Sequence, residues 1–287
     1  MRDGHVRRDT MFPLWLALNR PRCLQAGLHQ LPEQATPAEL FATLCTPTHG
    51  DRRRVTVPEG RNIFQIADQL DALGVSSRSR FLDAVTAPIH LELWDLHAPT
   101  AEGFLFPDTW YVPPDASAHQ LRDMMVERFV QVFRELNEAN PRGLTTLRER
   151  WGVGLYDAII IASIVEKEAV VDSERPIIAR VILNRLERGM RIQCDPTCVY
   201  GPERYQQVPT REACRDPDNR YSTYVIPALP PTPIANPGRR SLAAVLNPAD
   251  DPDVLYFAAM RDGTGRHAFA ATLDEHNRNV RRYLQRR

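Results

Sequence analysis

The chain has 287 residues, of which 43% are hydrophobic, and its 36 basic side chains are balanced by 36 acidic ones. A net charge of zero excludes a protein that coats nucleic acid or an anionic membrane through a basic excess. The hydrophobic content excludes a disordered chain. Lys167 is the only lysine among the basic residues, and such a bias over a whole chain is typical of genome composition rather than of function.

The predicted elements of residues 1–97 are small. Residues 1–50 are poorly patterned, whereas hydrophobic spacing and turn residues predict short elements from about residue 36 on. These elements are a helix over 38–44, a strand over 52–57, a turn at 58–60, and helices over 63–74 and 77–85. Together they favour a minor N-terminal module.

The stretch 102–111 brings four aromatic residues together with Glu102 and Asp108. Pattern alone favours an aromatic strand or loop that is anchored in the core. An amphipathic helix is predicted over 118–136, and a shorter helix over 144–152 that ends at a glycine.

The segment 158–165 is apolar on all sides, which predicts a buried helix or strand. A second helix is predicted to follow up to Gly189, capped by Asp172 or Ser173. The last third of the chain is rich in proline and turn residues, which exclude long helices before the final one. Its predicted elements are a helix over 241–246, a strand over 254–260, a turn over 262–265, a strand over 267–270, and a final helix that Thr272 caps and that runs to Leu284.

Common metal and cofactor motifs are missing from the sequence. It contains no HExxH, GxSxG, Walker A or GxGxxG motif. The cysteines form no CxxC pair and have no histidine partners at zinc-ligand spacing, so we expect neither a metal nor a cofactor. One disulfide is open to the chain in an oxidising compartment, but the sequence does not select its pair. The cysteines are Cys23, Cys45, Cys194, Cys198 and Cys214.

Glu166 is the acid candidate that the pattern singles out. It directly follows the apolar segment 158–165, so its carboxyl group should be partly desolvated. Desolvation favours the protonated form of a carboxyl group, which suits a general acid. Glu168 points to a different side of a helix. A solvated helix end, with Lys167 bridging one glutamate, explains the same residues equally well.

A pair of carboxylates would suit a hydrolytic glycosidase, which places two acids across the scissile bond. Glu166 with Glu102 or Asp108 could supply such a pair. The aromatic residues of 104–110 would suit the apolar face of a sugar ring. Spacing along the chain does not show whether these groups meet in space.

Five stretches, in order, resemble the endolytic murein transglycosylase family. They are EGFLFPDTWY (102–111), ASIVEKEA (162–169), VILNRLERGMRIQCDPTCVYG (181–201), YSTY with LPPTPIANPG (221–224 and 229–238), and LYFAAMRDGTGRHAFAATLDEHN (255–277). The resemblance covers about residues 98–284 closely and 51–97 more loosely.

The resemblance implies a lyase that cuts nascent peptidoglycan strands between N-acetylmuramic acid and N-acetylglucosamine. The product carries a 1,6-anhydromuramyl end, and cleavage would terminate strand elongation. The first glutamate of the EKE motif, Glu166, would be the catalytic acid/base. It would protonate the glycosidic oxygen and then accept the proton of the muramyl C6 hydroxyl, which attacks C1. Because this nucleophile belongs to the substrate, no second carboxylate is needed to activate water.

The resemblance also implies substrate contacts within the matching motifs. These side chains are expected to bind sugar or, for the two acids at 102 and 108, to shape the cleft or stabilise charge at C1. Hydrogen-bonding roles within the fold explain them equally well. The residues are Glu102, Asp108, Asn184, Gln193, Asp195, Thr197, Tyr200, Tyr224, His267 and His276.

Together, patterns and resemblance predict an α+β fold. A partial LysM-like module over 1–97 would precede a mixed α+β catalytic domain over 98–287. Members of the family act at the outer face of the cytoplasmic membrane, with peptidoglycan synthases as expected partners. This sequence has no stretch of about 20 apolar residues that could span a bilayer. We therefore expect a start that is shortened relative to the family, or an unanchored form.

Further departures from the family pattern leave Glu166 in place. Ser222 stands where asparagine is usual, Ala228 replaces a glycine, and Cys194 and Cys198 flank the DPT motif. Three other interpretations stay open. The protein could be a non-catalytic glycan-binding module that recruits the synthesis machinery, a hydrolytic muramidase, or an inactive product.

Overall fold

The computed structural model describes residues 35–45 and 52–283. These residues belong to two compact units. The smaller unit contains α2 (Pro37–Cys45), Arg53–Arg54 and Tyr111–Asp115, and the larger one contains Val55–Trp110 and the chain from Ala116 onward. The predicted domain boundary at residue 97 stays a prediction.

Helix α2 forms where the sequence predicts it. Thr36 donates hydrogen bonds from its backbone N and its Oγ1 to Glu39 Oε2, both at 2.8 Å, and Glu39 N donates to Thr36 Oγ1 at 3.3 Å. This reciprocal arrangement satisfies backbone groups that the first helical turn leaves unpaired.

The segment after residue 52 also follows the prediction. Strand β1 (Arg53–Thr56) pairs with β4 (Thr109–Val112). Asn62 and Gln65 form a capping box that starts α3 (Ile63–Ala72), and α4 (Arg78–Thr86) packs against it. The hairpin of β2 (Ile89–Leu91) and β3 (Leu96–Ala98), joined by the 3₁₀ turn Glu92–Trp94, was not predicted. These elements are not confirmed as a LysM-like module.

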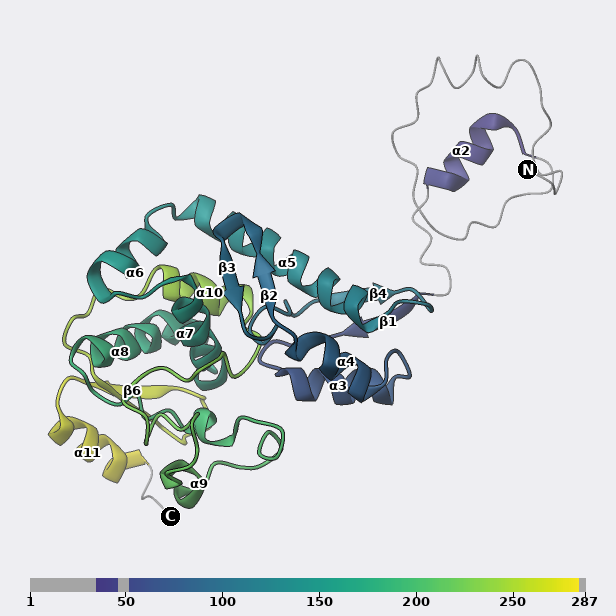
Figure 1. Cartoon of the computed structure of the whole chain (residues 1–287). Coiled ribbons are helices and arrows are strands. Elements are labelled where there is room, and N and C mark those ends of the chain that lie inside the picture. The colour runs from purple at the N-terminus through teal and green to yellow at the C-terminus, as the bar shows by residue number, and fades with distance from the viewer. Residues whose placement is uncertain (1–34, 46–51, 284–287) are drawn as a thin grey trace. The chain divides into compact units, whose positions relative to one another are not determined.

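The apolar segment 158–165 lies in a helix, α7 (Leu155–Glu168), whose residues 158–165 are all buried. In Figure 1, α7 lies beside α8 (Arg175–Glu187) and α10 (Arg239–Leu246), both of which pack against it. A helix that is surrounded in this way needs apolar residues on every side. Helix α5 (Ala118–Ala139) packs on α4 and α10, and α6 (Gly143–Trp151) packs on α8 and α10.

The start of α8 differs from the prediction. Asp172 and Ser173 lie in a 3₁₀ turn (Asp172–Glu174), and the N-cap of α8 is Glu174, which caps through no side-chain hydrogen bond. Asp172 instead accepts a hydrogen bond from Arg175 Nε at 3.1 Å. The Asp172 carboxylate, which the sequence predicted as a cap of α8, therefore binds Arg175 instead.

The last part of the chain forms the hairpin predicted from its turn residues. Strand β5 (Tyr256–Ala259) pairs antiparallel with β6 (His267–Ala270), and α11 (Leu273–Tyr283) packs on both. Figure 1 shows β6 between α8 and α11. The sheets of the described residues have two strands each and the helices are numerous, so the predicted α+β class is confirmed.

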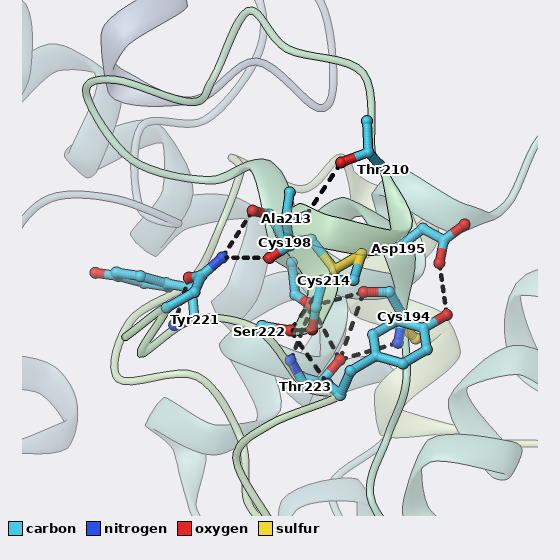
Figure 2. The surroundings of a disulfide bond; sticks show 12 residues. Cys194, Asp195, Cys198, Thr210, Ala213, Cys214, Tyr221, Ser222 and Thr223 are labelled. Carbon is cyan, nitrogen blue, oxygen red and sulfur yellow. Dashed lines mark hydrogen bonds between the residues drawn. A yellow bond between two sulfur atoms is a disulfide. The ribbon is translucent and has the colours of Figure 1, made fainter. Parts of the chain in front are cut away.

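A disulfide joins Cys198 to Cys214, which lies in the short helix α9 (Arg211–Arg215). Figure 2 shows Cys194 and Thr223 beside this bond. Cys194 is buried and carries a free thiol. Within 35–45 and 52–283, no helix combines the length and the apolar character that a membrane crossing requires.

A candidate active site around Glu166

Glu166 lies in the last turn of α7, and its carboxylate is held by three donors. Its side chain is only 6% exposed. Oε2 accepts hydrogen bonds from Gly238 N at 3.0 Å and from Ser241 Oγ at 2.7 Å, and it lies 3.3 Å from Arg175 Nη1. Gly238 is the N-cap of α10, so the positive end of that helix also faces the carboxylate. The carboxylate is therefore fixed in place by α8 and α10.

Arg175, Gly238 and Ser241 together hold the Glu166 carboxylate and are called its cradle below. Arg175 connects the parts of this cradle. Its side chain is 8% exposed, and it donates to Ser241 Oγ at 2.6 Å as well as to Asp172. A buried guanidinium destabilises the fold unless it is paired and hydrogen-bonded. Here the guanidinium is paired with two carboxylates and hydrogen-bonded to a hydroxyl. The network fixes both the position of Glu166 and the distance between α8 and α10.

The turn Pro58-Glu59-Gly60 lies against the same carboxyl group. Gly60 N donates to Asn236 O at 3.0 Å, and Asn236 N donates to Arg61 O at 2.9 Å. Gly60 has φ +74°, and a Cβ there would lie 3.5 Å from Glu166 Cγ. The turn therefore closes one side of the site.

Glu59 places a second carboxyl group beside Glu166. Burial and the charge of Glu166, in that order, raise the pKa of Glu59, while Arg175 and Arg240 act in the opposite direction. Sequence reasoning treated this residue only as part of a turn. Its place beside Glu166 could not be predicted from the sequence, because it depends on contacts between segments that are far apart in the chain.

Lys167 points to the turn rather than along α7. Its Nζ donates to Gly60 O at 3.3 Å. Burial is the main reason that its pKa is lowered, followed by the charge of Arg61. The ammonium thus helps to hold the turn beside Glu166.

Glu168 faces a different part of the molecule from Glu166, as predicted. Its surroundings include Cys194 and Asp195, and burial followed by the charge of Asp195 raises its pKa to about 7. The two glutamates of the EKE motif therefore have separate environments.

Glu102 is completely buried and is surrounded by donors. Its carboxyl group accepts hydrogen bonds from Ile63 N at 3.0 Å, Tyr200 OH at 2.8 Å and Asn236 Nδ2 at 2.9 Å. Burial raises its pKa to about 8, although these hydrogen bonds act in the opposite direction. The structure thus brings two of the predicted residues, Glu102 and Tyr200, together next to the 236–238 loop.

A pocket of about 370 Å³ brings three more predicted residues together. Gln193, Asp195 and Tyr224 line it, and Tyr224 OH donates to Asp195 Oδ1 at 2.5 Å. Arg211 and Arg215 of α9 also line it. The Cys198–Cys214 disulfide fixes α9 here, and Figure 2 shows Asp195 near this bond. The pocket therefore offers polar and cationic groups beside the end of α7 that carries Glu168.

The remaining predicted residues interact with other groups of the fold. Asn184 donates to two backbone carbonyls, Thr197 bonds Thr223, and Asp108 pairs with Arg128. His267 bonds Glu174 at 2.8 Å, and His276 stacks on Tyr256. None of these interactions involves Glu166, and the predicted contacts of these residues with sugar stay predictions.

One cluster in the described part of the chain has ligand atoms close enough to hold a metal. His90, Asp95 and His97 lie on the β2–β3 hairpin, are all exposed, and bring these atoms within 4.8 Å of one another. They are separate from the cradle that holds Glu166.

Comparison with known proteins supports the resemblance seen in the motifs. An endolytic murein transglycosylase of Bacillus subtilis is 28% identical over 97% of this chain and 78% of its own length. One of Streptococcus pneumoniae is 25% identical over 98% of this chain, which spans 54% of that longer protein. The crystal structure of a YceG-like protein of Listeria monocytogenes matches with a TM-score of 0.66 and 27% identity, covering 93% of this chain and 89% of that one.

The family model described as the YceG-like family matches residues 1–282. The predicted resemblance and the predicted enzyme class are therefore confirmed at the level of the family. The chain belongs to the YceG-like family.

Proposed function

We propose that this protein is a lytic transglycosylase that cleaves the β-1,4 bond between N-acetylmuramic acid and N-acetylglucosamine within peptidoglycan strands. The observation that carries this proposal is the fixed carboxylate of Glu166, at the junction of α7, α8 and α10. The names of the relatives supply the substrate class.

The cradle leaves one oxygen of Glu166 for the substrate. The hydrogen bonds and the ion pair that the described residues make with this group all go to Oε2. Oε1 can therefore accept the proton of the muramyl C6 hydroxyl while the oxygen of this hydroxyl attacks C1. Fixing the base in this way reduces the entropy that is lost on reaching the transition state. In the simplest form of the mechanism, Glu166 also supplies the proton to the leaving oxygen.

The product would carry a 1,6-anhydromuramyl end, since the attacking oxygen belongs to the same sugar as C1. Such an end cannot be extended from its blocked C1, which supports a role in terminating strand elongation together with peptidoglycan synthases. The Cys198–Cys214 disulfide supports a location in the oxidising envelope rather than in a reducing compartment.

The test is digestion of purified peptidoglycan, with the products separated by chromatography and identified by mass. We expect anhydromuropeptides from the wild type, and a loss of at least about 100-fold in Glu166→Gln, because general acid/base groups contribute about that much or more. Glu149→Gln, an exposed glutamate of α6, is the matched control and should be fully active.

Two outcomes would contradict the proposal. Products with reducing ends alone would identify a hydrolytic muramidase. A folded Glu166→Gln variant that keeps the full biological activity would identify a binding module.

A further inference from the structure

A second carboxyl group lies close to Glu166, and the proposed function does not yet use it. Glu59 packs its carboxyl group against the face of Gly238 that has no side chain. A Cβ at position 238 would lie 1.9 Å from Glu59 Oε1 and 2.2 Å from Cδ. The backbone N of the same glycine donates to Glu166 Oε2 at 3.0 Å. Because both groups contact one residue, their nearest oxygens are at most about 8 Å apart. This upper limit is compatible with the spacing of carboxyl pairs that act on glycosidic bonds, which is about 5–9.5 Å.

The turn that carries Glu59 is held by the residues that directly follow Glu59. Two backbone hydrogen bonds join Gly60 and Arg61 to Asn236, and the Lys167 ammonium donates to the Gly60 carbonyl. These contacts tie the turn to the loop before α10 and to the end of α7. Glu59 is therefore a positioned group, although its residue is exposed to solvent.

The two carboxyl groups have different surroundings. Glu166 is held by a guanidinium, a hydroxyl and a backbone N–H. Glu59 faces the titratable and charged groups of Glu166, Arg175, Arg240 and Asp172, and its pKa is raised by burial and then by Glu166. Two acids with environments that differ in this way divide the roles of acid and base in many enzymes.

We propose that Glu59 is the second catalytic carboxyl group of this site and gives its proton to the glycosidic oxygen. This inference rests on the proposed function. As the bond between C1 and the leaving oxygen breaks, that oxygen takes the Glu59 proton. The muramyl O6 bonds to C1, and the C6 hydroxyl proton passes to Glu166. Glu59 regains a proton and Glu166 loses one before the next turnover, so no proton is gained or lost overall.

The experiment compares Glu59→Gln with the wild type on purified glycan strands. Removing a general acid costs about 100-fold or more in kcat, and KM should change by no more than about twofold. Wild-type activity should fall as the pH rises through the pKa of Glu59, because the deprotonated acid cannot donate. This alkaline fall should be missing from the residual activity of Glu59→Gln. The Glu149→Gln control should keep both the rate and the profile.

Chemical rescue separates a proton donor from a structural residue. Because Glu59 is exposed, added formate should reach the space left in Glu59→Ala. It should increase the kcat of this variant at least about tenfold over its value without formate. Glu59→Asp should keep part of the activity. A kcat of Glu59→Gln within threefold of the wild type, or an unchanged pH profile, overturns the inference. So does a loss that formate does not restore.

Failure of this inference can be told apart from failure of the proposed function. If the wild type releases anhydromuropeptides and Glu166→Gln does not, while Glu59→Gln is active, only the role of Glu59 is wrong. If the wild type releases none, the proposed function itself is wrong.

Discussion

Glu102 should make the protein less stable as the pH rises, and Glu102→Gln should remove that dependence. Burial raises the pKa of Glu102 to about 8, from an ordinary value of 4.5. Between these two values the folded state holds a proton that the unfolded state has lost. The contribution of Glu102 to the unfolding free energy should therefore be highest below pH 4.5, decrease between pH 4.5 and 8, and level off above pH 8. The decrease is on the order of 5 kcal/mol, at about 1.4 kcal/mol for each pKa unit.

The amide of the variant should carry a constant cost instead. Asn236 directs its Nδ2 toward Glu102, and it cannot exchange N for O because its Oδ1 accepts from Gly103 N at 2.9 Å and Leu105 N at 2.8 Å. The oxygen of a glutamine at position 102 would accept from Ile63 N and Tyr200 OH. Its NH₂ group would then face Asn236 Nδ2, which is also a donor. A buried donor without an acceptor costs about 1–3 kcal/mol at every pH.

Denaturant unfolding of both proteins from pH 4.5 to 9 tests these magnitudes. The variant should be less stable at pH 4.5, and the difference should shrink and then change sign as the pH rises. Glu168, whose pKa is also raised, is present in both proteins and cancels in the comparison. A difference that stays constant over this range would refute the reasoning, because Glu102 would then keep the same protonation state in the folded and unfolded chains.

Two further predictions concern the disulfide and the single lysine. Cys214→Ser opens a cross-link between residues 16 positions apart and should lower the unfolding free energy by about 3 kcal/mol. Denaturant unfolding should show the same loss for Cys198→Ser and for the double variant, and a larger loss in the double variant would contradict this account. Lys167→Arg should leave turnover and its pH profile within about twofold, since either cation can donate to the Gly60 carbonyl. A larger change in kcat would show that the ammonium itself is required.

Local patterns predicted most of the elements because their signals lie within a few residues. The turn over 262–265 predicted the β5–β6 hairpin, and the helical spacing of apolar residues from residue 63 on predicted α3. The apolar run 158–165 could not distinguish a helix from a strand, because burial on all sides removes the periodic signal. In the structure this run is a helix, and α8 and α10 pack around it. The β2–β3 hairpin was missed because each strand has three residues and no alternation.

The catalytic candidate could be found from the sequence, but its cradle could not. Glu166 stands out because it is the first charged residue after an apolar run. Arg175, Gly238 and Ser241 come from separate parts of the chain, and nothing local links them to Glu166. The start of α10 gave a partial signal, since Asn236-Pro237-Gly238 precedes a helix and a helix N-terminus can bind a carboxylate.

Two glycines determine which carboxyl groups can share this site. Gly60, at φ +74°, turns the chain so that its carbonyl meets Lys167 while the preceding Glu59 faces Gly238. Gly238 has no side chain, and a methyl group there would occupy the space of the Glu59 carboxyl group. The same Gly238 uses its backbone N–H to bind Glu166. Two acids can therefore lie close together without a direct hydrogen bond, because one residue contacts the first with its Cα face and the second with its amide. A proton donor and a proton acceptor need that separation if a glycosidic bond is to fit between them.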